Sequence, residues 1–197
     1  MIINEIFYSL QGEGANWGKA AIFIRLTGCN LRCHFCDTEF DTGSKMSDED
    51  ILNAISQYPG KFIIWTGGEP TLQLRLQTVM FFKEKGYYQA IETNGTQAVP
   101  EGIDYITCSP KPEAIQLLHD NFPNGINEFR YPIQSKGSLP PPVTELPHAD
   151  NYLVSPVFIG REAIELDKEA LERCVEFVKA NPEWRLSIQM HKILGFR

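Results

Sequence analysis

The stretch AIFIRLTGCNLRCHFC, residues 21–36, decides the fold of this chain. Its first half, Ile22–Leu26, is an apolar run rich in β-branched and aromatic residues, with the length of a buried strand. Its second half is a loop that holds three cysteines, Cys29, Cys33 and Cys36, within eight residues. The sequence therefore predicts a strand whose carboxyl end carries a cluster of thiols.

Outward from this stretch, short β-branched or aromatic runs alternate with helical patterns. The predicted strands are Ile22–Leu26, Phe62–Trp65, Tyr87–Glu92, Tyr105–Cys108, Glu128–Pro132, Tyr152–Val154 and Arg185–Gln189. The predicted helices are Asp48–Gln57 (with Ser47 as its cap), Leu72–Lys85, Glu113–Asp120 and Lys168–Ala180. Because strands that alternate with helices pair in parallel, we expect an α/β fold that is either doubly wound or a partial barrel.

Polar, glycine-rich turns follow several of the predicted strands. These turns are Thr27–Cys29, Thr66–Pro70, Thr93–Thr96, Ser109–Lys111 and Ser155–Pro156. Doubly wound sheets and parallel barrels both bind their ligands at the carboxyl ends of the strands. The sequence therefore predicts a ligand site on this rim of the sheet.

Length and composition fit one domain over residues 1–197, since 43% of the chain is hydrophobic. The net charge of −7 argues against a general nucleic-acid binder. No apolar run reaches the ~20 residues that span a bilayer, and the first residues lack the layout of a secretory signal. We therefore expect a cytoplasmic protein, in which five cysteines, an odd number, do not form a disulfide framework.

The spacing Cys-x3-Cys-x2-Cys lets one loop wrap a metal centre, because thiolates bind soft metals. A structural zinc site normally needs four protein ligands, for which His34 or Cys108 is a candidate. Three thiolates suit an iron–sulfur cluster better, if one iron stays open for a ligand from outside the protein. A zinc site and three buried, inert thiols remain the alternatives.

The cysteine spacing, with Phe35 directly before Cys36, resembles that of the radical S-adenosylmethionine (SAM) superfamily, as does the GGEP turn, Gly67–Pro70. The resemblance implies a partial (incomplete) parallel β/α barrel. It also implies a [4Fe–4S] cluster held by Cys29, Cys33 and Cys36, with SAM on the fourth iron. One electron from such a cluster cleaves SAM to methionine and a 5′-deoxyadenosyl radical.

Further segments narrow the resemblance and keep their order along the chain. They are Asn4–Gly14, Cys36–Thr38, Ile91–Thr96, Ser109–Lys111 and Trp184–Lys192, and they are similar to the 7-carboxy-7-deazaguanine synthase family of queuosine biosynthesis. The family reaction converts 6-carboxy-5,6,7,8-tetrahydropterin to 7-carboxy-7-deazaguanine, with ring contraction and loss of ammonia. The resemblance implies that SAM is regenerated and acts as a catalytic cofactor.

The same resemblance implies a set of ligand-binding residues. Those for SAM are Phe35, Cys36, Asp37, Gly67, Gly68, Glu69, Gly95, Ser109, Pro110, Lys111 and Pro156, with Ser155 a weaker candidate. Those for the substrate are Leu10, Gln11, Gly12, Glu13, Arg25, Thr93, Gln189 and His191, with Lys192 beside them. The resemblance further implies a Mg²⁺ ion supported by Thr38, a reducing partner such as flavodoxin, and a homodimer.

The residue types suit a pterin. Its amide and amino edge can pair with backbone groups of Leu10–Gly12 and with the carboxylate of Glu13, and its carboxylate needs a cation such as Arg25. The carboxylate of Glu69 is a candidate partner for the SAM ammonium. From the residues alone, a flexible turn for Gln11–Gly14 and an ion-paired strand residue for Arg25 remain open.

Two other classes of protein also remain open. A small glycyl-radical activase shares the cysteine loop and SAM cleavage but acts on a partner protein. A non-enzymatic, zinc-stabilised binding module shares only the thiols. Leu10–Gly14 and Arg25, placed before the cysteine loop, favour a small acidic heterocycle as the substrate.

Overall fold

A nine-stranded sheet organises the chain, with the strand order β11-β8-β7-β6-β5-β4-β2-β1-β3. The computed structural model describes residues 1–33, 36, 39, 41–159 and 164–196. The strands of this sheet are β1 (Ile2–Leu10), β2 (Ala20–Leu26), β3 (Ser44–Lys45), β4 (Phe62–Gly67), β5 (Tyr88–Thr93), β6 (Tyr105–Cys108), β7 (Ile126–Ile133), β8 (Ala149–Pro156) and β11 (Trp184–Leu186). A separate pair joins β9 (Phe158–Ile159) to β10 (Glu165–Leu166).

Five α-helices and three short 3-10 helices connect or follow these strands in the described ranges. The α-helices are α1 (Asp48–Ile55), α2 (Leu76–Glu84), α3 (Leu118–Asn121), α4 (Lys168–Ala180) and α5 (Met190–Leu194). The 3-10 helices are η1 (Pro70–Leu72), η2 (Pro112–Leu117) and η3 (Val143–Glu145). No helix within the described residues is long and apolar enough to cross a membrane.

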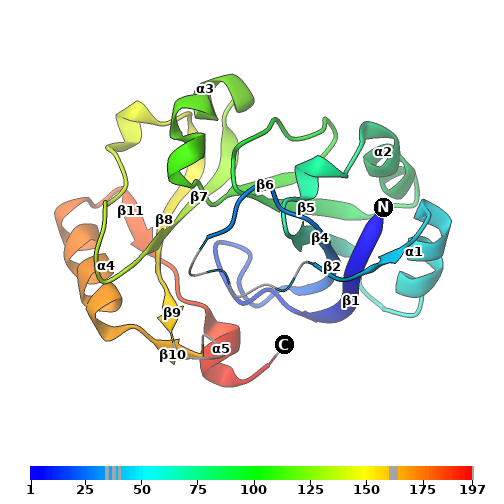
Figure 1. Cartoon of the computed structure of the whole chain (residues 1–197), viewed down its shortest axis with the longest axis horizontal. Coiled ribbons are helices and arrows are strands. Elements are labelled where there is room, and N and C mark those ends of the chain that lie inside the picture. Colours follow the sequence, from blue (N-terminus) through cyan, green and yellow to red (C-terminus); the bar gives the residue numbers. More distant parts are fainter. Residues whose placement is uncertain (34–35, 37–38, 40, 160–163, 197) are drawn as a thin grey trace.

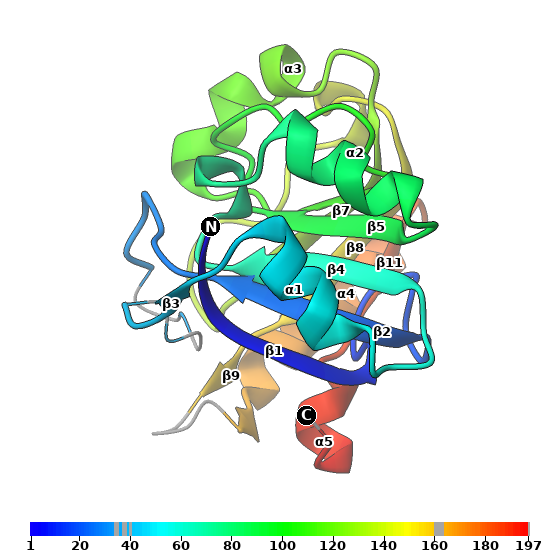
Figure 2. The same ribbon diagram turned by 90° about the vertical axis from the view of Figure 1, so that its right-hand side faces the viewer.

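The parallel strands follow one another across the sheet in sequence order. From β2 through β4, β5, β6, β7 and β8 to β11, each strand pairs in parallel with the next. A doubly wound sheet reverses its order at a switch point, so this steady progression is that of a barrel. In the part of the chain that the structure describes, the edge strands β11 and β3 do not pair with each other, so the barrel is incomplete. The predicted partial parallel β/α barrel is confirmed, with α1 to α4 around its outside (Figure 1 and Figure 2).

Some predicted elements differ from the observed ones. Residues 113–120, predicted as one helix, form η2 followed by α3, and neither has a side-chain cap to satisfy the free backbone groups at its start. Residues 72–75 precede α2 rather than belong to it. The strand predicted to reach Gln189 ends at Leu186. Ser187 makes the last bond to β8, from its backbone N–H to Val154 O, and its hydroxyl accepts from Gly14 N–H in the loop after β1.

The strand β1 and the helix α5 were not predicted. The alternation of apolar and polar residues in β1 is broken near Asn4, where the register with β2 shifts between Ile3 and Glu5. By contrast, the predicted cap of α1 is confirmed, because the Ser47 hydroxyl accepts from the backbone N–H of Asp50 at 3.1 Å.

Alternation along the strands assigns side chains to two faces of the sheet. On β2, Ile22 and Ile24 point outward and pack with α1 and α2, whereas Phe23 points inward. On β7, Phe129 and Tyr131 point outward into a second apolar cluster with α3 and α4. The inner face carries a small apolar cluster made by Phe7, Ala21, Phe23, Ile64 and Ala90. Next to this cluster, the same alternation turns charged residues inward, as described below.

Phe82 on α2 gives a test of the outer core. It is fully buried, and its ring lies 5.4 Å from that of Trp65 on the sheet. We expect Phe82→Ala to lower the free energy of unfolding by about 3–5 kcal/mol, because it leaves a cavity between helix and sheet. Urea denaturation measures this loss. The matched control is Met80→Ala on the same helix, where 42% exposure predicts a change within about 0.5 kcal/mol. Equal losses in the two variants would contradict this packing.

Candidate active site

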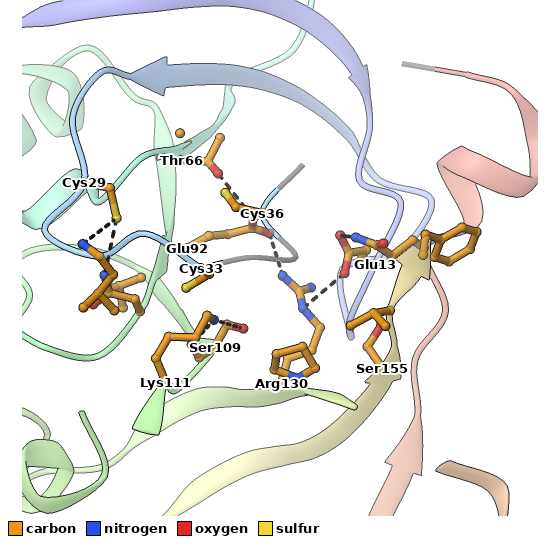
Figure 3. Close-up of a pocket in the computed structure, with 18 of the residues that line it drawn as sticks. Glu13, Cys29, Cys33, Cys36, Thr66, Glu92, Ser109, Lys111, Arg130 and Ser155 are labelled. Atoms are coloured by element: carbon orange, nitrogen blue, oxygen red, sulfur yellow. Dashed lines mark hydrogen bonds and ion pairs between the residues drawn. The ribbon is translucent and has the colours of Figure 1, made fainter. Parts of the chain in front are cut away.

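The three cysteines line one cavity of about 230 Å³ at the carboxyl ends of the strands. We call it the cysteine cavity. Figure 3 shows Cys29, Cys33 and Cys36 on one side and Arg130, Glu13 and Ser155 on the other. The remaining lining residues are Leu31, Thr66, Gly67, Gly68, Glu92, Thr93, Asn94, Ser109, Lys111, Pro132, Pro156, Val157, Phe158, Gln189 and Lys192. Every turn that the sequence predicted for this rim contributes at least one residue to the cavity.

Nitrogen donors lie close to one of the thiols. The backbone N–H of Leu31 points to Cys29 Sγ at 3.4 Å, and the Asn94 side-chain amide lies 3.9 Å from the same sulfur. Asn94 is itself held by the side chains of Asn30 and Thr96. Hydrogen bonds to the cysteine sulfurs are among the contacts that tune an iron–sulfur cluster, so these two donors suit a ligand role for Cys29. The predicted residues His34, Phe35, Asp37 and Thr38 lie outside the described residues.

Lys111 closes the cavity beside Cys33. Its ammonium donates to the Ser109 carbonyl at 2.6 Å and to the Ser109 hydroxyl at 3.0 Å. Burial lowers the pKa of Lys111 and raises the pKa of the Cys33 thiol, and the lysine charge partly offsets the effect on Cys33. Lys111 also borders a cavity of about 510 Å³ that contains Pro110 and shares Cys33 with the cysteine cavity. A ligand in the cysteine cavity would therefore meet a cation at this point.

The GGEP turn brings the ends of β2 and β4 together. A Cβ atom at Gly68 would lie 1.9 Å from the Gly28 carbonyl oxygen, and one at Gly67 would lie 2.3 Å from that of Leu26. Only glycine allows this approach, and Gly67 also has a positive φ of 112°. The two backbones then bond directly, as Glu69 N–H donates to Gly28 O at 2.9 Å.

The Glu69 carboxylate is fully buried, and its partners belong to the protein. One oxygen accepts from the Thr71 hydroxyl at 2.7 Å and from the Thr93 hydroxyl at 2.8 Å. The other accepts from the Asn94 backbone N–H at 2.7 Å. Of the predicted SAM residues in the described ranges, Glu69, Gly95 and Pro110 do not line the cysteine cavity, and Pro110 lines the cavity of about 510 Å³. Glu69 acts instead as a clamp between the turns after β4 and β5.

A second cavity, of about 130 Å³, lies beside the first and is called the Arg25 cavity. It is lined by Phe7, Leu10, Gln11, Gly12, Glu13, Phe23, Arg25, Thr66, Glu92, Gln189 and His191. The structure thus brings together all the predicted substrate residues except Thr93, which lines the cysteine cavity. Arg25 pairs with Glu5 at 2.9 Å and lies 5.5 Å from the centre of the Phe7 ring. The two cavities share Glu13, Thr66, Glu92 and Gln189 as a common wall.

The C-terminal segment covers the loop that follows β1. Met190 N–H donates to Gly12 O at 2.9 Å, and the Gln189 side chain donates to Glu13 at 3.0 Å. A Cβ atom at Gly12 would lie 2.2 Å from His191 Nδ1, so the helix α5 seats on this glycine. Residues 189–191 therefore pack on Gly12 and Glu13 at the Arg25 cavity. We call residues 189–191 the roof of this cavity.

Sequence reasoning missed a buried ionic group that includes Glu13 and Glu92 of the common wall. Arg130 on β7 contacts Glu13, Glu92 and Glu128, and Arg130 is 7% exposed at its side chain. The available signal was the strand alternation, because Glu92 follows the outward Ile91 and Arg130 lies between Phe129 and Tyr131. Cys108, by contrast, lies in the outer core with a pKa raised by burial.

Glu69→Gln tests the clamp. A glutamine amide would place a donor against the hydroxyl and N–H donors that the carboxylate now accepts, so we expect a loss of about 1–3 kcal/mol in stability. Urea denaturation measures it, with Glu84→Gln on the exposed face of α2 as the matched control. If Glu69→Gln is as stable as the control, the buried bonds to Glu69 are not what holds these turns.

Gly12→Ala tests the seat of α5. The added methyl group collides with His191, so we expect faster hydrogen exchange at the Met190 amide, which now bonds to Gly12 O. The control is a double-mutant cycle with His191→Gly, which removes the colliding atoms. In that background, Gly12→Ala should leave the exchange rate unchanged; a further increase would show that the methyl group acts elsewhere.

Comparison with known proteins agrees with this geometry. The model of the radical SAM superfamily matches residues 23–127. The chain is 40% identical to the 7-carboxy-7-deazaguanine synthase of Bacteroides thetaiotaomicron over 99% of this chain and 98% of that protein. It is 37% identical to the synthase of the same name from Haemophilus influenzae, over 98% and 92% of the two chains.

Among solved structures, QueE from Escherichia coli superposes with a TM-score of 0.68 at 27% identity, covering 96% of this chain and 94% of that one. The likeness thus extends from the cysteine loop through the roof at residues 189–191. This chain belongs to the radical SAM superfamily and, within it, to the 7-carboxy-7-deazaguanine synthase family.

Proposed function

We propose that this protein converts 6-carboxy-5,6,7,8-tetrahydropterin to 7-carboxy-7-deazaguanine, with ring contraction and loss of ammonia. The observation that carries the proposal is the common wall between the cysteine cavity and the Arg25 cavity. A substrate held by Arg25 lies next to the chamber of the three thiols, with Glu13 and Glu92 between them. Such adjacency suits a reaction that is initiated in the cysteine cavity and takes place on a substrate held in the Arg25 cavity.

Members of the radical SAM superfamily carry a [4Fe–4S] cluster and SAM, and the donor set of this chain fits both. Cys29, Cys33 and Cys36 offer three thiolates on one cavity, which leaves one iron of a cluster for SAM. When bound, the cluster and SAM supply the one-electron chemistry that initiates the reaction. Residues proposed to hold SAM are Gly67, Gly68, Ser109, Pro110, Lys111, Ser155 and Pro156, with Glu69 and Gly95 supporting their turns.

The Arg25 cavity supplies the groups that a carboxylated pterin needs. Arg25 provides the cation for its carboxylate, close to the apolar ring of Phe7. The carboxylate of Glu13 and the amide of Gln11 face the same space and pair with the amide and amino edge. The roof of Gln189 and His191 limits the access of water to the reacting ring.

Three further features belong to the same proposal and rest on the family resemblance. A Mg²⁺ ion, supported by the hydroxyl of Thr38, neutralises charge near the substrate carboxylate. A flavodoxin-like protein supplies the electron, and the protein acts as a homodimer. The single continuous sheet from β1 to β11 supports one functional domain over the whole chain.

The two other classes that the sequence left open lose their support. The full-length relatives are synthases, neither activases nor binding modules. The roof over the Arg25 cavity also favours a small substrate over a protein segment.

Anaerobic turnover tests the proposal. Reconstituted protein, with about four iron and four sulfide per chain, receives 6-carboxytetrahydropterin, SAM and a reductant. We expect 7-carboxy-7-deazaguanine and ammonia, with SAM recovered. Absence of the deazaguanine from protein whose cluster is spectroscopically intact would contradict the proposal.

Cys33→Ala provides the variant for that test, because it removes one of the three proposed cluster ligands. We expect it to lose both the cluster absorbance and SAM cleavage. Cys174→Ala is the matched control, since Cys174 is a buried thiol on α4, remote from the cavity. Loss of the cluster in both variants would mean that the effect is one of folding.

A further inference from the structure

The guanidinium of Arg130 is the centre of the buried ionic group that includes Glu13 and Glu92 of the common wall. Its Nε lies 3.4 Å from Glu13, its Nη2 lies 3.0 Å from Glu92 and its Nη1 lies 3.3 Å from Glu128. Figure 3 shows Arg130 reaching up from β7 between Glu13 and Glu92. One planar fork thus fixes three carboxylates that come from three separate parts of the chain.

Within this group, Glu128 has a structural role. It is 1% exposed, and it accepts from the Ala15 backbone N–H at 2.8 Å and from the Tyr105 hydroxyl at 3.0 Å. A Cβ atom at Gly14 would lie 2.3 Å from its carboxylate. These contacts anchor the loop after β1 to the floor of the barrel, and they leave Glu128 outside the lining of both cavities.

Glu13 and Glu92 are different, because both line the cysteine cavity and the Arg25 cavity. Glu92 also accepts from the Gln11 side chain at 2.9 Å, and Glu13 accepts from the Gln189 side chain at 3.0 Å. Each carboxylate has two oxygens and about four acceptor positions, so both retain capacity for donors in the cavities. Burying a carboxylate without a cation is strongly unfavourable, so Glu13 and Glu92 depend on the charge of Arg130.

We propose that Arg130 is a positioning residue that holds Glu13 and Glu92 as an oriented pair of acceptors for the N–H edge of the substrate heterocycle. This proposal rests on the proposed function, because the proposed function places the pterin in the Arg25 cavity. Arg130 acts through the two carboxylates rather than by contact with the reacting atoms. Its fork donates a hydrogen bond to Glu92 through Nη2 and places Nε in ion-pair contact with Glu13, an arrangement that one lysine ammonium does not reproduce.

The charge state of Glu92 supports this role. Burial alone raises its pKa, but attraction to Arg130, hydrogen bonds from Arg130 and Gln11, and attraction to Arg25 bring the pKa below its ordinary value. The other acidic groups that face Arg130 are Glu13 and Glu128. Removing Arg130 removes both its charge and its hydrogen bond, two of the contributions that lower the pKa of Glu92, so the pKa rises and Glu92 protonates at higher pH.

Two substitutions separate the charge of Arg130 from its geometry. Arg130→Met removes both, and Arg130→Lys keeps the charge but loses the fork. For each variant, kcat and KM for the pterin are measured from acidic to neutral pH. Calorimetric binding of the same pterin without reductant gives a readout independent of turnover. Lys83→Met, which removes the cation of an ion pair with Asp104 outside both cavities, is the control.

We expect Arg130→Met to raise KM and the dissociation constant at least about tenfold, the effect of losing one charged hydrogen bond. The acidic limb of its kcat/KM profile should move to higher pH. Arg130→Lys should raise KM while leaving the acidic limb in place, and Lys83→Met should match the wild type.

Wild-type KM and binding in Arg130→Lys would overturn the proposal, as would an unmoved acidic limb in a folded Arg130→Met. If Arg130→Met does not fold, the KM and binding of Arg130→Lys decide the matter alone. Wild-type protein that neither binds nor converts the pterin contradicts the proposed function instead. The two failures are therefore distinguishable.

Discussion

The buried carboxylate of Glu69 is the interaction on which the rim of the site depends. It joins the GGEP turn after β4 to Thr93 and Asn94 after β5, while the backbone of the same turn bonds to the end of β2. Three strand ends are thereby fixed relative to one another. Asn94 in turn lies 3.9 Å from the Cys29 sulfur, so the contacts of Glu69 extend to the start of the cysteine loop.

A second constraint is that the two faces of the sheet differ in polarity. The outer face is apolar and packs against the helices, and that packing gives the sheet the stability to hold charged groups on its inner face. Near the centre of the barrel the inner face is apolar, through Phe7, Phe23 and Ile64. The charged wall of Glu92 and Arg130 lies next to this cluster, and the thiols lie at the rim. Polarity therefore changes in layers from the barrel interior to the site.

The sequence predicts those parts of the site whose partners are close in the chain. The cysteine loop and the GGEP turn are local patterns, and the alternation in Ile22–Leu26 is enough to place Arg25 on the inner face. Arg130 was missed because two of its three partners, Glu13 and Glu92, are distant in the chain, with Glu92 38 residues away. Their meeting depends on which strands become neighbours, and no local pattern records that.

Glu69 shows a different limit of prediction. Its acidic side chain beside two glycines suggests a ligand contact, whereas the structure surrounds it with protein donors. The residue type identifies an acceptor but not its partner. Likewise, β1 was missed because its register shift interrupts the alternation that identifies strands.

The roof has a consequence for how the protein is made. Gln189 bonds to Glu13 across 176 residues of chain. At a synthesis rate of about 5–20 residues per second, the loop after β1 leaves the ribosome roughly ten to thirty seconds before the segment that covers it. The sheet can assemble strand by strand during that interval, since each parallel strand adds beside its predecessor. The Arg25 cavity closes only afterwards, when the C-terminal residues that cover it have been synthesised. The growing chain therefore forms the strands that line the site well before the cavity is complete.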